Sequence, residues 1–116
     1  MRHESLYLMD MIDAARAIRQ FIARTTPEAF VHDDLTRSAV LQKLIVIGEA
    51  AARLPKPYRE RHPNIPWVDV IAMRNFVVHA YFSVEWEIIW NTATLDVPEL
   101  EQALALILDG ISTHEA

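Results

Sequence analysis

Hydrophobic residues recur at steps of three and four along most of this chain, the spacing that lines up side chains on one face of an α-helix. The first stripe predicts a helix from about Glu4 to Arg24 and comprises Leu8, Met11, Ala15, Ile18 and Ile22. Thr26 followed by Pro27 is typical of a helix N-terminus, and it predicts a short helical turn through Val31. The first quarter of the chain is therefore predicted to be helical.

A second, wider stripe predicts a helix that is capped by Asp33 or Asp34 and ends at about Leu54. Its apolar face comprises Val40, Leu44, Ile47, Ala51 and Leu54, flanked by Leu41, Ile45, Gly48 and Ala52. So broad an apolar arc indicates several neighbours, and we expect this helix to lie at the centre of the fold. Glycine is costly inside a helix, so we expect close backbone packing at Gly48.

Prolines and capping residues divide the second half of the chain. The stretch from Pro55 to Pro66 holds four prolines and is predicted to be irregular, with the next helix beginning near Trp67. Ser83 is expected to cap a further helix, and the run from Asp96 to Glu99 is typical of a capping box that opens the last one. No segment has the pattern of a strand. We predict an all-α, up-and-down bundle of four to five helices, forming one domain over residues 1–116.

Composition narrows the classes of protein. The chain has 116 residues, of which 52% are hydrophobic and only two are glycine, so a substantial helical core can form. The absence of cysteine excludes disulfides and thiolate metal sites. No apolar run approaches the roughly 20 residues of a membrane span, and the N-terminus is unlike a signal peptide. We therefore expect a soluble cytoplasmic protein with no membrane association.

The charge is unevenly distributed. The net charge is −5, which disfavours binding to a polyanion. However, the segment from Arg37 to His79 has seven basic and three acidic residues. A nucleic acid could therefore meet this middle segment alone, although an ordinary solvated surface would have the same composition.

One segment carries most of the candidate chemistry: Arg74-Asn75-Phe76-Val77-Val78-His79-Ala80-Tyr81. It places a cation, an amide, an imidazole and a phenol in an otherwise apolar helix. On a regular helix Asn75 and His79 share a face, whereas Arg74 and His79 differ by about 140° and roughly 7.5 Å of rise. The two could converge if the helix breaks near His79, or if a second copy supplies one of them across a two-fold axis.

The order R-N-x-x-x-H-x-Y resembles the R-x4-6-H motif of HEPN-domain ribonucleases, and the trailing x-Y resembles HepT-type toxins. Other features occur in the family's order, namely Gly48-Glu49-Ala50, Ile65-Pro66-Trp67, His79-Ala80-Tyr81-Phe82 and the pair Trp86 and Trp90. The resemblance implies an endoribonuclease that uses no metal or other cofactor and leaves a 2′,3′-cyclic phosphate. Arg74 would stabilise the phosphorane, His79 would transfer protons and Asn75 would orient His79 or hold a phosphate oxygen.

The resemblance also implies partners. HEPN ribonucleases form homodimers with composite sites, and HepT-type toxins pair with a small nucleotidyltransferase antitoxin of the MntA type. That partner would transfer AMP to Tyr81 and so block the site. Further contacts to RNA phosphates are expected from Arg37, Lys43 and Arg53. Glu49 is expected either to pair with Arg53 one turn on or to reach the site, and we favour the former.

Two other functions compete with a toxin ribonuclease. The chain could be a catalytically inactive nucleotide-binding or scaffold subunit of a two-component nucleotidyltransferase. It could also be a plain helical dimerisation module. Cleavage of RNA separates the first function from both alternatives, and nucleotide binding without cleavage favours the scaffold subunit.

Overall fold

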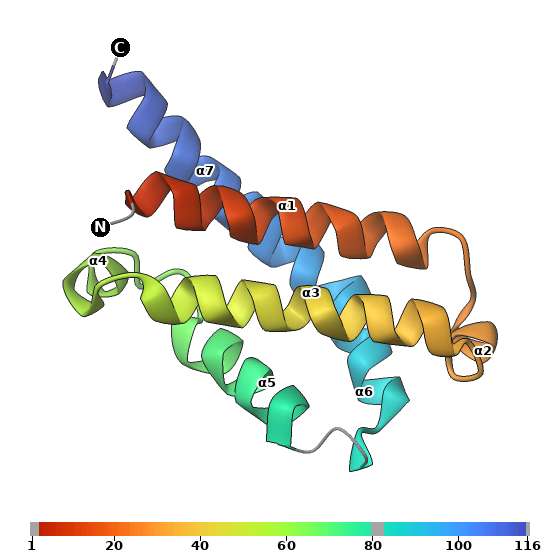
Figure 1. Ribbon diagram of the computed structural model, residues 1–116. Helices are drawn as coiled ribbons and strands as arrows, with labels where there is room; N and C mark the ends of the chain where they lie inside the picture. Colours follow the sequence, from red (N-terminus) through yellow and green to blue (C-terminus); the bar gives the residue numbers. More distant parts are fainter. Residues whose placement is uncertain (1–2, 80–82, 116) are drawn as a thin grey trace.

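Four helices of 13 to 20 residues form an antiparallel bundle. The computed structural model describes residues 3–79 and 83–115, and no strand occurs among them. Helix α1 (Glu4–Ile22) lies beside α3 (Asp34–Arg53), and α3 also packs against α5 (Trp67–His79). Helix α7 (Val97–Glu115) packs along α1 (Figure 1). The all-α bundle is thus confirmed, and α3 lies between α1 and α5, whereas α7 packs on α1.

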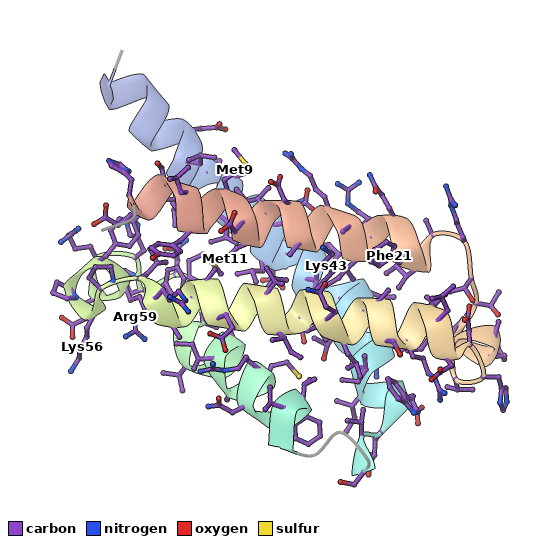
Figure 2. All side chains as sticks on the ribbon, in the orientation of Figure 1. Met9, Met11, Phe21, Lys43, Lys56 and Arg59 are labelled. Carbon is purple, nitrogen blue, oxygen red and sulfur yellow. The ribbon has the colours of Figure 1, made fainter. Side chains whose placement is uncertain are left out.

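The predicted apolar stripes form the core. Leu8, Met11, Ala15 and Ile18 of α1 are fully buried, and Met11 lies between α1 and α3 (Figure 2). The stripe of α3 is buried along its whole length, comprising Val40, Leu44, Ile47, Ala51 and Leu54. Burial of the larger of these side chains contributes roughly 1.5–3 kcal/mol each, so both stripes add substantially to the stability of the fold.

Two predicted helix starts are confirmed by side-chain caps. The Thr26 hydroxyl accepts a hydrogen bond from the Ala29 amide at the start of α2 (Pro27–Phe30). Asp33 accepts from the Thr36 amide at 3.1 Å and from the Thr36 hydroxyl at 2.6 Å, so it caps α3. Hydrogen bonds from Thr36, above all from its hydroxyl, hold the pKa of Asp33 below its ordinary value of 3.8.

The short helix α2 attaches its end of the bundle through one aromatic side chain. Phe30 is fully buried. Its ring meets Trp86 edge-on at 6.2 Å and Trp90 at 5.2 Å, both from α6 (Trp86–Asn91). Trp86 and Trp90 therefore share a face of α6, and this face packs on α2.

Two predictions about the second half of the chain are wrong. The proline-rich stretch is not wholly irregular, because Lys56–Glu60 form helix α4. Pro55 is its N-cap and Pro57 lies in its first turn, where a missing N–H costs nothing. Ser83 does not cap α6, which begins at Trp86 with Glu85 as N-cap. Where a helix begins depends on tertiary packing as well as on capping. At the start of α6, that packing is the contact of Trp86 and Trp90 with Phe30.

The predicted break before the last helix does not exist. α6 continues through a π-helical turn, η2 (Thr92–Asp96), directly into α7, so Asp96 is not an N-cap. Pro98 cannot donate to the carbonyl four residues earlier and its ring crowds that carbonyl. The widened π turn accommodates this. Thr92 and Ala93 are buried in the core, which keeps the chain helical across the irregularity.

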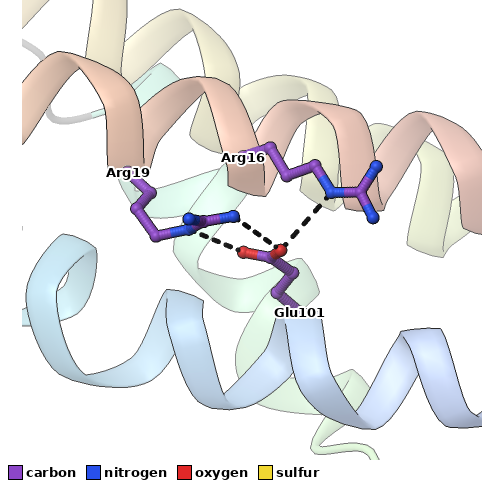
Figure 3. Close-up of polar contacts among 3 residues, drawn as sticks. All are labelled: Arg16, Arg19 and Glu101. Atoms are coloured by element: carbon purple, nitrogen blue, oxygen red, sulfur yellow. Dashed lines mark hydrogen bonds and ion pairs between the residues drawn. The ribbon is translucent and has the colours of Figure 1, made fainter.

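A carboxylate on α7 bridges to α1. Glu101 accepts hydrogen bonds from Arg19 Nε at 3.2 Å and Nη2 at 3.0 Å, and its Oε2 lies 3.5 Å from Arg16 Nε (Figure 3). Both arginines are more than half exposed, so the cluster contributes modestly to stability. It nevertheless ties α7 to one position along α1.

No helix in the described part of the chain combines the length and apolar character needed to cross a membrane.

Candidate functional site

Helix α5 carries the motif and has two dissimilar faces. Val77 is fully buried, and Val70 and Met73 pack against the core. The opposite face is exposed along positions 68, 72 and 75, which are three or four residues apart. On this face the Val68 side chain is 80% exposed. Phe76, two turns further along at the edge of the face, is 39% exposed. The motif helix thus presents an apolar stripe with one amide, Asn75, to the outside.

Arg74 lies on the inner side of α5, against α3. A Cβ atom built on Gly48 would come within 2.2 Å of the Arg74 Cβ and 2.8 Å of its Cγ. The predicted close packing at Gly48 is therefore confirmed, and its partner is the motif arginine. Only glycine lets the stem of Arg74 lie directly on the α3 backbone.

The guanidinium of Arg74 is held from α3. Its Nη1 donates to Oε1 of Glu49 in an ion pair, and the Arg74 side chain is 22% exposed. Its Nε is buried without a hydrogen-bond partner among the described residues. Glu49 therefore reaches the motif. The favoured prediction, a pair with Arg53 one turn on, is wrong, because no such pair occurs in the part of the chain that the structure describes.

The remaining motif residues lie near the end of α5. Asn75 is exposed, and its position is 100° around the helix from Arg74. The described part of α5 extends to His79. Tyr81 lies outside the described residues. Arg74 and Asn75 thus emerge on different sides of one helix, as the spacing predicted.

Arg37 is engaged in structural contacts at the other end of α3. Its Nη1 donates to the Val31 carbonyl at 2.9 Å, its Nη2 lies 3.6 Å from Asp34, and its guanidinium lies 4.5 Å from the centre of the Trp86 ring. It is eleven residues, or roughly 16 Å of helix, from Gly48. The structure does not bring Arg37 to Arg74.

Of the other two basic candidates, only Arg53 lies on the side of the motif. Lys43 is turned about 120° around α3 from Glu49, and Figure 2 shows it between α3 and α1. Arg53 is exposed and one turn beyond Glu49 on the same face. It adjoins the α4 end of the bundle, where Lys56 and Arg59 also lie (Figure 2).

A cavity of about 300 Å³ lies on the inner side of α5, between α3 and the helix formed by η2 and α7. Its walls are mainly apolar, and its polar lining includes Asp69, Asp96 and Glu99. Neither Arg74 nor Asn75 lines it. Its carboxylates would repel a phosphate, so the cavity is not a candidate for binding RNA.

Glu49 is the site residue that sequence reasoning undervalued. Its sequence neighbour Gly48 was the available signal, because a glycine inside a helix marks where another element comes close. The residue after it is then near that element too. Helix periodicity alone could not distinguish a contact across two helices from one along α3.

Comparison with known proteins assigns the chain to a family. The family model described as Ribonuclease HepT-like matches residues 11–107. A Thermococcus cleftensis protein named as a probable ribonuclease HepT is 37% identical over 95 residues, covering 82% of this chain and 86% of that relative. A Caldanaerobacter subterraneus protein named as a candidate RNase is 35% identical, covering 88% of this chain and 91% of its own. No solved structure matches the chain at a significant level. The match spans the core helices, the Gly48–Glu49 pair and the motif, and the chain therefore belongs to the HepT-like ribonuclease family.

Proposed function

We propose that this protein is the toxin of a type VII-like HepT/MntA pair and a metal-independent endoribonuclease that acts in the cytoplasm. The observation that carries the proposal is that α3 holds the motif arginine, Arg74, through Glu49, on a helix that also exposes Asn75 and carries His79. Family membership supports the same reaction.

The chemistry requires no metal. His79 accepts the proton of a ribose 2′-OH, whose oxygen attacks the adjacent phosphorus. Negative charge builds up on the non-bridging oxygens, and the guanidinium of Arg74 stabilises it through paired N–H donors. The bond to the 5′-oxygen then breaks, and that oxygen takes a proton from an imidazolium. The products are a 2′,3′-cyclic phosphate and a 5′-hydroxyl, with Asn75 holding a phosphate oxygen or orienting His79.

The site is composite, across a homodimer. Arg74 lies on the inner side of α5 and Asn75 on its outer side, and by helix register position 79 belongs with Asn75. An exposed apolar stripe runs along that outer side through Val68 and Phe76. A second copy packed on this stripe would remove apolar surface from water and bring its motif to face the first.

Modification of Tyr81 regulates the activity. A nucleotidyltransferase of the MntA type transfers AMP from ATP to the Tyr81 hydroxyl, with loss of pyrophosphate. On a helix continued to Tyr81, the added phosphate would share the face of Arg74, pair with its guanidinium and repel RNA. Tyr81→Phe should keep ribonuclease activity and escape neutralisation. Intact-mass analysis after co-expression with the partner tests this, because the added mass should map to Tyr81 in multiples of one AMP.

Cleavage by purified dimer is the decisive experiment. Arg74→Ala and His79→Ala should each lower kcat/KM by about 10²–10⁴ while keeping the helical circular dichroism of the wild type. Asn75→Ala should have a smaller effect, and EDTA should have none. Wild-type protein that binds nucleotides but cleaves no RNA would instead indicate an inactive scaffold subunit of a nucleotidyltransferase.

A further inference from the structure

Glu49 and Arg74 come from different helices and meet where α3 and α5 are closest. Gly48 provides the space, because a side chain there would overlap the Cβ and Cγ of Arg74. Glu49 follows directly on α3, and its carboxylate accepts from Nη1 of Arg74. The stem and the head of the arginine are therefore both held by consecutive residues of α3.

This arrangement restricts the guanidinium more than an ordinary surface pair does. The Arg74 side chain is 22% exposed and the Glu49 side chain 43%, so water screens the pair only in part. The Nε group is buried, which leaves the Nη groups as the donors nearest solvent. With Nη1 fixed on a carboxylate, the planar group cannot turn about its own axis, and Nη2 keeps one direction.

We infer that Glu49 is a positioning residue for the proposed ribonuclease site and orients Arg74 toward the phosphorane. The inference rests on the proposed function. A guanidinium that is already oriented does not have to reorient when negative charge develops on the phosphate, so no free energy is spent on reorganisation. The carboxylate also has an opposite effect, because its negative charge near the phosphate weakens binding of the ground-state RNA.

These two effects predict a split that a purely structural ion pair would not produce. Glu49→Gln keeps the size of the side chain and removes its charge. We expect kcat to fall by about tenfold to a hundredfold, the equivalent of one charge-assisted hydrogen bond. KM should stay the same or fall, because repulsion of the RNA is relieved. An unchanged kcat would overturn the inference, whether or not KM is raised.

Glu101→Gln is the matched control. It also removes a carboxylate that bridges two helices through arginines, but at the contact of α7 with α1. Its kcat and KM should equal those of the wild type, and its loss of stability should be comparable with that of Glu49→Gln. If both variants lose kcat in proportion to stability, Glu49 is merely structural.

Chemical rescue tests the orientation directly. Arg74→Ala leaves a vacancy beside the Glu49 carboxylate that free guanidinium ion can fill. Guanidinium chloride at about 50 mM, well below the molar concentrations that unfold proteins, should restore part of the lost rate to Arg74→Ala. The double variant Arg74→Ala/Glu49→Gln should require about tenfold more guanidinium for the same rate. Equal rescue of both variants would contradict the inference.

A readout without RNA separates this inference from the proposed function. In protein with ¹⁵N-labelled arginine, the signal that is absent from Arg74→Ala identifies the Arg74 side chain. Restricted rotation of its Nη groups in the wild type and free rotation in Glu49→Gln support the orienting role of Glu49 even if no RNA is cleaved. Free rotation in the wild type rejects that role even if RNA is cleaved normally.

Discussion

A single missing side chain decides how the motif arginine is placed. At Gly48 the approach of α5 leaves no room for a Cβ, and the neighbouring Glu49 receives the guanidinium. The two residues act together, one by its size and the other by its charge. An arginine in a helix is usually solvated, whereas here it is part of the contact between two helices.

Substitution of the two glycines should have opposite effects. In Gly48→Ala the new Cβ overlaps the stem of Arg74 and lies 3.3 Å from the Val70 carbonyl oxygen, so α5 must move away from α3. The free energy of unfolding should fall by about 1–3 kcal/mol. Gly110→Ala in α7 meets nothing within 4 Å and should raise it by about 0.5–1 kcal/mol, because alanine favours the helix. Urea unfolding measures both, and a stabilised Gly48→Ala would show that the helices are not in tight contact.

The three basic candidates should separate in RNA binding. Arg53→Ala should weaken binding of a non-cleavable 2′-deoxy analogue several-fold and lower the salt slope by about one phosphate contact, because Arg53 is exposed on the face of Glu49. Lys43→Ala, on the α1 side of α3, should bind as the wild type does. Arg37→Ala should lose stability and keep its affinity, since its guanidinium is engaged with Val31 and Trp86. Filter binding across a salt series checks all three.

Among the helices, capping and core packing compete to set where each one ends. Thr26 and Asp33 end irregular segments because their oxygens accept the free amides of the next turn. At Asp96 the same kind of signal fails. There the chain is already helical, and burial of Thr92 and Ala93 holds it so. Pro98 produces a π turn instead of a break.

The cap at Asp33 makes stability depend on pH. The pKa of Asp33 is lowered in the folded state, first by the Thr36 hydroxyl, so the carboxylate stabilises the fold above its unfolded pKa, near 3.8. That contribution is lost as the pH falls through the lowered folded value. Asp33→Ala should therefore be less stable than the wild type at neutral pH, and the difference should shrink below about pH 4. Thermal melts from pH 7 to pH 2 test this, with Asp13→Ala as a control on the exposed side of α1. A difference independent of pH would rule out the charged cap.

At the scale of the whole molecule, the outer side of α5 is exposed among the described residues. This is the surface on which the proposed second copy would pack to complete the site. Phe76 and Val78 are 39% and 50% exposed beside Asn75. Such residues are ordinary one at a time, but along one helix they form a stripe. The Leu35 side chain, 81% exposed at the start of α3, lies apart from it.

Mixing two inactive variants tests whether Arg74 and His79 act across the dimer. Arg74→Ala and His79→Ala are each expected to be nearly inactive alone. If one protomer supplies the arginine and its partner the histidine, random exchange gives half heterodimers with one intact site in two, so about a quarter of the wild-type rate should return. No recovery after subunit exchange would place both residues in the same protomer's site. Ala72→Glu should abolish recovery by charging the outer stripe, whereas Leu35→Glu should not.

Local rules were sufficient for much of this molecule. The stripes of α1 and α3 and the caps at Thr26 and Asp33 follow from residues close together in the chain. Helix periodicity is a local property, and side-chain caps act within one turn. The divergence of Arg74 from Asn75 follows from the same geometry.

Contacts between distant segments settled the rest. Glu49 pairs with Arg74, 25 residues away in the chain, and not with Arg53 on its own helix. The reason is that Gly48 allows α5 to approach α3 closely. Arg37 was predicted to contact RNA from its charge alone. In the structure its guanidinium packs on Trp86, so its role is structural. The π turn replaced a predicted break because burial of Thr92 and Ala93 outweighs a capping pattern. In each case the interaction that stabilises the observed arrangement is with a residue far away in the chain, which the local sequence pattern cannot identify.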